Sequence, residues 1–184
     1  SKNAKITNIK GVYEEVFKRY QQEPIEFLST NSAEIAYINS TSITCGSAEL
    51  EQASLLLIGA VHQPAPGWDN EGSPVDNASN TADYLLRRYK HKGDNFLDGV
   101  YGHYSIIVYD RQTDTFLLGG DPQGFSSLFV FETPNGVAFS TNLNLLGYAI
   151  GKETSPDRTY ESFLLTYAFT PFNHTFYSGI RSLP

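Results

Sequence analysis

The sequence predicts a layered α+β domain, in which antiparallel strands pack against a small number of helices. The first observation is a strand over Tyr101–Tyr109 with apolar residues on both faces, which indicates a sheet that is covered on both sides. The second is the continuous apolar run SLLLIGAV at residues 54–61, typical of a strand buried on both faces. The third is the order of elements along the chain: a helix, strands, a helix, a central hairpin, more strands and short helices.

The N-terminal part of the chain predicts one helix and two short strands. Asn8 caps a helix over 9–22, which has an apolar stripe at Val12, Val16 and Tyr20 and ends before Pro24. Half-buried strands are expected at 25–28 and 34–38, on either side of a polar turn at 29–32. Residues 39–42 are expected to form a loop.

A long loop and a second helix follow the buried strand. Prolines and glycines exclude regular structure over residues 62–78. Ser79 or Asn80 is expected to cap the next helix, and Gly93 is expected to end it. Its inner face is predicted to carry Ala82, Leu85, Leu86 and Tyr89, and its outer face Arg87, Arg88 and Lys90.

The central hairpin and two short helices make up the rest. Residues 110–114, DRQTD, connect the strand over Tyr101–Tyr109 to a partner over 115–118, and residues 119–124 form a turn. Residues 128–131 are expected to return to the same sheet. A helix over 142–150 stops at Gly151. Asp157 caps a last helix that ends near residue 167 and is predicted to bury Tyr160, Phe163, Leu164 and Tyr167.

Composition and charge place the chain among globular proteins. Its 184 residues suit one domain, with 40% hydrophobic and 18% charged residues. The net charge of −7 disfavours nucleic acids and acidic membranes as partners, and no apolar run reaches the roughly 18 residues of a membrane helix. One cysteine excludes an internal disulfide, and the N-terminus lacks the apolar core of a signal peptide. The expected location is cytoplasmic.

Motifs in the last two thirds of the chain carry a family resemblance. Gly102-His103-Tyr104 leads to Asp110, and a D-x-x-G-x-x-x-L-F segment follows at residues 121–129. The strand and short helix at residues 138–146 and the segment 175–184 come next. In combination these resemble the N-terminal glutaminase domain of class II glutamine amidotransferases, and most closely that of asparagine synthetases.

The resemblance implies a four-layer αββα sandwich of the N-terminal nucleophile hydrolase type. Residues 1–184 would form one such domain, either as the N-terminal domain of a larger synthetase or as its stand-alone relative. In that family the nucleophile is an N-terminal cysteine whose own α-amine serves as the base. An oxyanion hole and groups that hold the two ends of glutamine complete the site.

The nucleophile that this resemblance implies is missing at the start of the chain. The sequence opens with Ser1-Lys2 and lacks the apolar, Gly-rich strand that would hold a terminal serine, so Ser1 is interpreted as a leader or added residue. Cys45-Gly46 would require processing, and only 14 positions separate Cys45 from Gly59, too few for the helix and strands that the family places between them. Cys45 is therefore interpreted as a structural thiol near a strand end.

The positions that resemble the oxyanion hole and the glutamine-binding groups lack the required side chains. The family's Asn-Gly-Glu-Ile-Tyr-Asn motif is matched by residues 58–63, where Gly59 is kept but Ile58 has no side-chain donor; one lost donor costs about 10²–10³ in rate. The family's Ser-Asp-Thr-Glu is matched at residues 79–82, where Asn80 brings no charge. No Arg or Lys between Arg19 and Arg87 could clamp the substrate carboxylate. The hypothesis is a vestigial pocket at Gly59 and Asn80 without catalytic residues.

Other polar residues give no further site in this interpretation. His62 and His103 lie far apart in the sequence without an acidic partner, so neither a zinc site nor a triad is expected. Three acidic residues in the long loop lack the spacing of a calcium loop. No cofactor and no metal are expected in this domain.

The favoured hypothesis is a catalytically degenerate glutaminase-like domain that acts as a scaffold. It would belong to an asparagine synthetase-related, ATP-dependent amide-forming protein, whose synthetase domain, in cis or in trans, would carry the catalysis. A homodimer is left open. One alternative is an active glutamine amidohydrolase that uses Ser1, or Cys45 after processing. Another is a small-ligand binding module with its pocket near Gly59 and Asn80.

Overall fold

The computed structural model describes residue 11 and residues 25–30, 32–38, 45–63, 78–134, 136–151, 156–169 and 173–183. The chain divides into two compact units, with one formed by residues 23–126 and the other containing residues 127–184. Both units contain antiparallel strands, and the chain has mixed helices and sheets, as the predicted α+β class requires. The four-layer arrangement and the single domain over 1–184 stay predictions.

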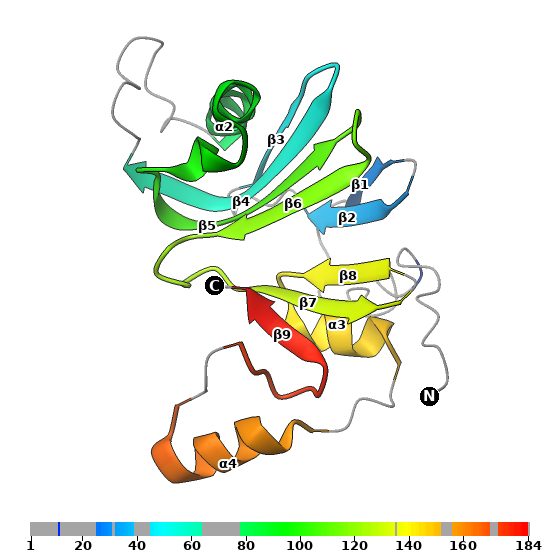
Figure 1. Ribbon diagram of the computed structural model, residues 1–184, viewed down its shortest axis with the longest axis vertical. Helices are drawn as coiled ribbons and strands as arrows, with labels where there is room; N and C mark the ends of the chain where they lie inside the picture. The colour runs from blue at the N-terminus through cyan, green and yellow to red at the C-terminus, as the bar shows by residue number, and fades with distance from the viewer. Residues whose placement is uncertain are drawn as a thin grey trace. The chain divides into compact units, whose positions relative to one another are not determined.

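A four-stranded antiparallel sheet forms the centre of the first unit. Its order is β3 (Cys45–Glu49), β4 (Ala53–Gln63), β5 (Tyr101–Asp110) and β6 (Thr115–Gly120). Helix α2 (Ala78–Lys92) lies across one face of this sheet, over β3 and β4 (Figure 1). A 3₁₀ helix, η2 (Gly93–Leu97), leads from α2 to β5.

The core of this unit lies between α2 and the sheet. Odd-numbered residues of β4 and even-numbered residues of β5 face the helix, because alternate residues of a strand point to opposite faces. The opposite face of the central strands is buried too, at Leu56 and its cross-strand partner Ile107. Both strands therefore confirm the prediction of burial on two faces. The buried side chains on the α2 face include Leu55, Leu57, Leu85, Leu86, Phe96, Tyr104, Ile106 and Val108.

A separate two-stranded sheet precedes the central one. It consists of β1 (Ile25–Ser29) and β2 (Glu34–Ile38), which pair antiparallel as predicted. The Thr30 hydroxyl closes the connecting turn by donating to the carbonyl of Ala33 at 3.1 Å. The predicted helix over 9–22, apart from Gly11, and the predicted loop at 39–42 lie outside the described residues. Strand β4 continues to Gln63, two residues into the predicted loop, whose part from 64 to 77 also lies outside them.

The second unit contains a three-stranded antiparallel sheet and two helices. The sheet order is β8 (Gly136–Ser140), β7 (Leu128–Thr133) and β9 (Ile180–Leu183). Helix α3 (Leu143–Ala149) packs on β7 and β8, and Asn142 caps it by accepting the N–H of Leu145 at 3.0 Å (Figure 1). Helix α4 (Arg158–Tyr167) is capped by Asp157, as predicted. The small core of this unit is centred on Leu146, Ile150 and Ile180.

The central hairpin is longer than predicted, and the strand after it belongs to another sheet. Strand β6 continues through Gly119 and Gly120, which pair with Ile106 and Ser105, so these glycines extend the strand and do not form a turn. The turn begins at Asp121. The prediction that residues 128–131 return to the same sheet is wrong, because β7 is the central strand of the second sheet. Strand periodicity shows which residues are extended and leaves open which strand they pair with.

Three helix predictions are also wrong. Arg88 was placed on the outer face of α2, but it is only 7% exposed and its Nη2 donates to the carbonyl of Asp98 at 2.5 Å. Helix α2 begins at Ala78, so Asn80 lies within its first turn and is not the N-cap. Helix α4 buries none of its residues, although its apolar stripe predicted burial. For Arg88 and for α4, the sequence pattern describes the helix alone, whereas the elements packed against the helix decide which side chains are buried.

Candidate functional site

The end of strand β4 has a backbone geometry that only glycine fits. Gly59 has φ of +101°, and a Cβ at this position would lie 2.1 Å from the backbone oxygen of His103 on β5. Gly102 on β5 is restricted in the same way, because a Cβ there would lie 2.3 Å from the backbone oxygen of Ala60 on β4. The register then shifts between Val61 and Gln63, which is a β-bulge. The two strands therefore approach closely and change direction at this point.

The residue before Gly59 offers no side-chain donor to the oxyanion site that is expected here from the sequence. Gly59 provides the unusual φ, but the preceding residue is Ile58, a half-buried apolar side chain that cannot donate a hydrogen bond. Asn80, the other residue of the predicted pocket, is exposed on the first turn of α2. That Gly59 and Asn80 line one pocket stays a prediction.

Cys45 lies beside this strand end. The antiparallel pairing of β3 with β4 places Cys45 opposite Ile58, next to Gly59 along the strand. The 14 positions between Cys45 and Gly59 in the sequence therefore do not separate them in space. This interval contains only the β3–β4 hairpin and no helix. The absence of such a helix is what the sequence argument against a nucleophile at Cys45 relies on.

The surroundings of Cys45 keep its thiol protonated. The pKa of Cys45 is raised to about 11, mainly by burial and to a smaller extent by the negative charge of the nearby Glu26 carboxylate. Burial also raises the pKa of Tyr37 to about 12, with added contributions from its hydrogen bond to Glu26 and the charge of that carboxylate. At pH 7 a thiol with this pKa is a thiolate about once in 10⁴ molecules, and the thiolate is the nucleophilic form. Reactive cysteines instead lie near cations or helix N-termini.

We expect slow alkylation of Cys45 in the folded protein. Its rate with iodoacetamide should rise about tenfold for each pH unit between 7 and 9, because the thiolate fraction rises by that factor below the pKa. Replacing Glu26 with Gln removes one of the two causes of the raised pKa and should increase the rate at pH 7.5. Glu49→Gln on β3 is the control, since Glu49 does not contribute to the pKa of Cys45. Fast alkylation that is independent of pH would contradict this assignment.

Three aromatic side chains meet at the same end of the sheet. The imidazoles of His62 and His103 lie 5.0 Å apart between ring centres, with their planes 88° apart. Phe125 packs against His103 at 4.5 Å. The sequence interpretation treated the two histidines as unrelated, whereas the β4–β5 register and its bulge bring them together. Pairing the apolar run with the central strand would have revealed this. No group of three or more metal-binding side chains occurs among the residues that the structure describes.

Asp121 organises the turn that leaves β6. Its carboxylate is fully buried and accepts the N–H groups of Gln123 and Phe125 at 3.1 Å each and of Ser126 at 2.8 Å. Its own N–H donates to the carbonyl of Tyr104 at 2.9 Å. Burial alone would raise the pKa of Asp121, but these backbone hydrogen bonds outweigh it and the pKa is lowered. The carboxylate therefore holds a charge inside the fold and fixes where Phe125 lies.

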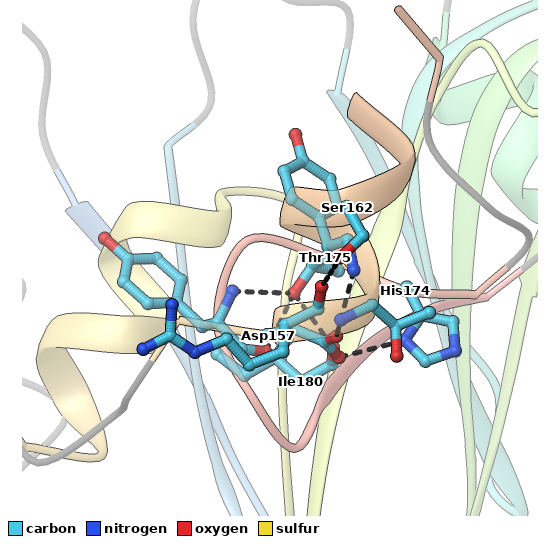
Figure 2. A network of polar contacts seen from close by, with 9 residues as sticks. Asp157, Ser162, His174, Thr175 and Ile180 are labelled. Atoms are coloured by element: carbon cyan, nitrogen blue, oxygen red, sulfur yellow. Dashed lines mark hydrogen bonds and ion pairs between the residues drawn. The ribbon is translucent and has the colours of Figure 1, made fainter. Parts of the chain in front are cut away.

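A polar network in the second unit holds the start of α4 (Figure 2). Asp157 Oδ1 accepts the N–H groups of Thr159 at 2.8 Å and Tyr160 at 3.0 Å, and its Oδ2 lies 2.9 Å from Nδ1 of His174. The N–H of Asp157 donates to the carbonyl of Phe176 at 2.9 Å. Burial acts to raise the pKa of Asp157, but His174 and the backbone donors lower it overall. Residues 173–177 are thereby attached to the N-terminus of the helix.

The same network contains a hydroxyl that is not a nucleophile. Ser162 donates its proton to the carbonyl of Arg158 at 2.8 Å, so the hydroxyl serves the helix backbone. Thr175 donates to the carbonyl of Ile180 at 2.9 Å, which ties the segment to the start of β9 (Figure 2). The combination of serine, histidine and aspartate in this network is structural, because the nucleophile of a triad must donate to the imidazole.

Helix α4 has an apolar face of which no residue is buried. Tyr160, Phe163, Leu164 and Tyr167 share one side of the helix by their spacing, and Leu164 is 43% and Tyr167 62% exposed. Phe163, Tyr167 and Phe169 contact one another, with ring centres 5.5–6.0 Å apart. These residues, together with Phe176, are called the α4 aromatic patch. Large apolar patches at a surface mark interaction sites.

None of the helices in the described part of the chain combines the length and the apolar character that crossing a bilayer demands.

Comparison with known proteins identifies one family. Residues 69–184, more than half of the chain, match the model of a glutamine amidotransferase domain. The match includes strand β5, the Asp121 turn and residues 127–184 of the second unit. A search of curated proteins found no match to the sequence.

Proposed function

The chain belongs to the glutamine amidotransferase domain family, and from this membership we propose that it is a catalytically degenerate member that no longer hydrolyses glutamine. Its role is that of a scaffold in an ATP-dependent amide-forming protein related to asparagine synthetase. The N-terminal nucleophile hydrolase architecture and the four stacked layers are part of this proposal. A synthetase domain, in the same chain or in a companion, carries the catalysis.

The chemistry around Gly59 argues against glutamine hydrolysis. The only thiol of the chain lies next to this glycine in the neighbouring strand, but burial and Glu26 keep it protonated. A thiol nucleophile needs a neighbour that lowers its pKa, such as a cation or an imidazolium, whereas the Glu26 carboxylate raises the pKa of Cys45. Ile58 in turn brings no side-chain donor to an oxyanion. A nucleophile that is not activated would by itself strongly reduce the turnover of glutamine. The loss of one oxyanion donor would have the same effect by itself.

The α4 aromatic patch carries the scaffold role. Helix α4 is fixed at its N-terminus by the Asp157 network, yet none of its residues is buried. A helix that is held by polar contacts while its apolar face stays exposed gains little stability from that face. The patch consists of aromatic and leucine side chains, and aromatic residues are enriched at the centres of protein interfaces. We therefore assign it to the contact with the synthetase domain.

Glutaminase activity and domain association test the two halves of this proposal. Purified chain, together with the Ser1→Ala and Cys45→Ser variants, is incubated with glutamine and the released ammonia is measured. We expect no release above buffer from any of the three. Release by the unmodified chain that disappears in either variant would restore the amidohydrolase alternative.

The second arm measures the association of the chain with the synthetase domain by titration calorimetry. Leu164→Asp combined with Tyr167→Asp should weaken it at least about 100-fold, because each removes apolar contact and buries a charge. Thr166→Asp is the matched control, since residue 166 lies on the other side of the helix from residues 164 and 167. The double variant should keep the free energy of unfolding of the chain within about 0.5 kcal/mol. Equal affinities for the double variant and the control would contradict the scaffold assignment.

A further inference from the structure

Two of the four histidines of the chain face each other at the end of β4 and β5. His103 is paired with Ala60 of β4, and His62 is the extra residue of the β-bulge that follows. Val61 and Tyr104 belong to the core that faces α2, so the residues next to them in each strand point the other way. His62 and His103 therefore lie on the same face of the sheet, opposite α2.

The surroundings hold these two imidazoles in place and leave their nitrogens available. The close approach at Gly59 and Gly102 fixes the backbone on both strands, and Phe125 packs against the ring of His103. The Asp121 turn positions Phe125 through its backbone N–H. Both histidines are exposed, and neither imidazole takes part in a hydrogen bond within the described residues.

We propose that His62 and His103 form a binding site for one divalent transition metal ion, of the class that includes Cu²⁺, Ni²⁺ and Zn²⁺. Imidazole nitrogen is a preferred ligand of these ions, and carboxylate-binding ions such as Mg²⁺ and Ca²⁺ are disfavoured. Two imidazoles with metal–nitrogen bonds of about 2.0–2.1 Å and a tetrahedral angle between them place their ring centres about 5 Å apart. The observed separation is 5.0 Å.

Such a site is open. The described residues hold no third histidine, cysteine or carboxylate close enough to complete a group of three, so water or an exogenous ligand fills the remaining positions. By the general order of divalent affinities, Cu²⁺ binds most tightly. This inference does not depend on the loss of glutamine hydrolysis, because it involves neither Cys45 nor Ile58.

Titration of the purified chain with CuCl₂ and, separately, ZnCl₂ tests the site. Calorimetry should give one ion per chain, and the electron paramagnetic resonance spectrum with Cu²⁺ should show coupling to imidazole nitrogens. His62→Ala and His103→Ala should each weaken Cu²⁺ binding at least about tenfold, since even groups that only support a metal ligand cost about 10–100-fold when they are removed. The remaining histidines supply matched controls. His91→Ala, at the exposed end of α2, and His174→Ala, in the Asp157 network, should leave the affinity unchanged.

Several outcomes would overturn the site. Unchanged Cu²⁺ affinity in both the His62 and the His103 variants places the ion elsewhere, and an affinity that falls only in Cys45→Ser assigns it to the thiol. A chain that binds neither ion leaves the two rings as a packing contact. Because the variants could alter the strand end, His62→Gln is measured beside His62→Ala, and each variant must keep the circular dichroism spectrum of the unmodified chain. In the unmodified chain, substoichiometric Cu²⁺ should broaden the NMR signals of His62 and His103 before those of His91 and His174, and the reverse order would also overturn the proposal.

Discussion

Replacing Gly59 with Ala should destabilise the protein by about 3–5 kcal/mol, because a methyl group there overlaps a backbone oxygen and requires a backbone angle that alanine avoids. The added Cβ would lie 2.1 Å from the carbonyl oxygen of His103, and φ at Gly59 is +101°. The neighbouring atoms are backbone atoms of a central strand, so they cannot rotate away as a side chain could. For a chain of this size the loss corresponds to a fall of roughly 10 °C in Tm.

Gly93→Ala is the matched control for this substitution. Gly93 also has a positive φ, +58°, but no atom lies within 4 Å of an added Cβ. Only the backbone strain remains there, at about 1–2 kcal/mol. Thermal unfolding of the two variants and the unmodified chain, followed by circular dichroism, separates the two contributions. If Gly59→Ala cost no more than Gly93→Ala, β4 and β5 would not approach as closely as described.

The same geometry explains why residue 59 is a glycine. In the resembled family the glycine at this position supplies an oxyanion donor. In this chain the close approach of β4 and β5 is by itself enough to require glycine, because any side chain at residue 59 would collide with β5. Gly59 is thus explained by packing alone, and its presence does not indicate activity. Ile58 says more about activity than Gly59 does. The backbone geometry at residue 58 would also accept a side chain with a hydrogen-bond donor, so packing does not explain why the donor is missing.

Local sequence patterns predicted most of the helices and strands, because the residues that an element buries recur at the period of that element. The apolar run at residues 54–61 became β4, and the stripe with Leu85 and Leu86 faces the sheet from α2. The same patterns failed where a second element decides the outcome. Arg88 is buried because the backbone at Asp98 lies against it, and none of the residues of α4 is buried despite its apolar stripe. A stripe shows which side of a helix favours burial and leaves open what covers it.

The candidate site was harder to predict than the fold because its residues come together only through strand register. His62 and His103 are 41 positions apart in the sequence, and the pairing register of β4 with β5 brings them together on one face. Cys45 lies next to Gly59 across a hairpin in the same way. The thiol was correctly interpreted as lying at a strand end, since Cys45 is the first residue of β3.

Removal of the Asp121 carboxylate should have an effect of similar size to that of Gly59→Ala, by a different mechanism. Asp121→Ala leaves the N–H groups of Gln123, Phe125 and Ser126 without their acceptor, and hydrogen bonds to a charged group contribute about 1.5–3 kcal/mol each. With partial compensation by water, we expect a loss of about 3–5 kcal/mol in the free energy of unfolding. Asp110→Ala, in an exposed hairpin turn where the carboxylate accepts two N–H groups, is the control and should cost about 1 kcal/mol.

The pH dependence of stability distinguishes the charge of Asp121 from its shape. Because the pKa of Asp121 is lowered in the folded state, its charge stabilises the fold at pH values above the ordinary carboxyl pKa of about 4. That contribution is lost as the pH falls through the folded-state pKa. The difference in unfolding free energy between the unmodified chain and the neutral isostere Asp121→Asn should therefore be constant between pH 5 and 7 and shrink below pH 4. Urea denaturation at pH 7, 5 and 3 measures it, and a difference that stays constant down to pH 3 would show that the turn depends on the oxygen acceptors and not on the charge.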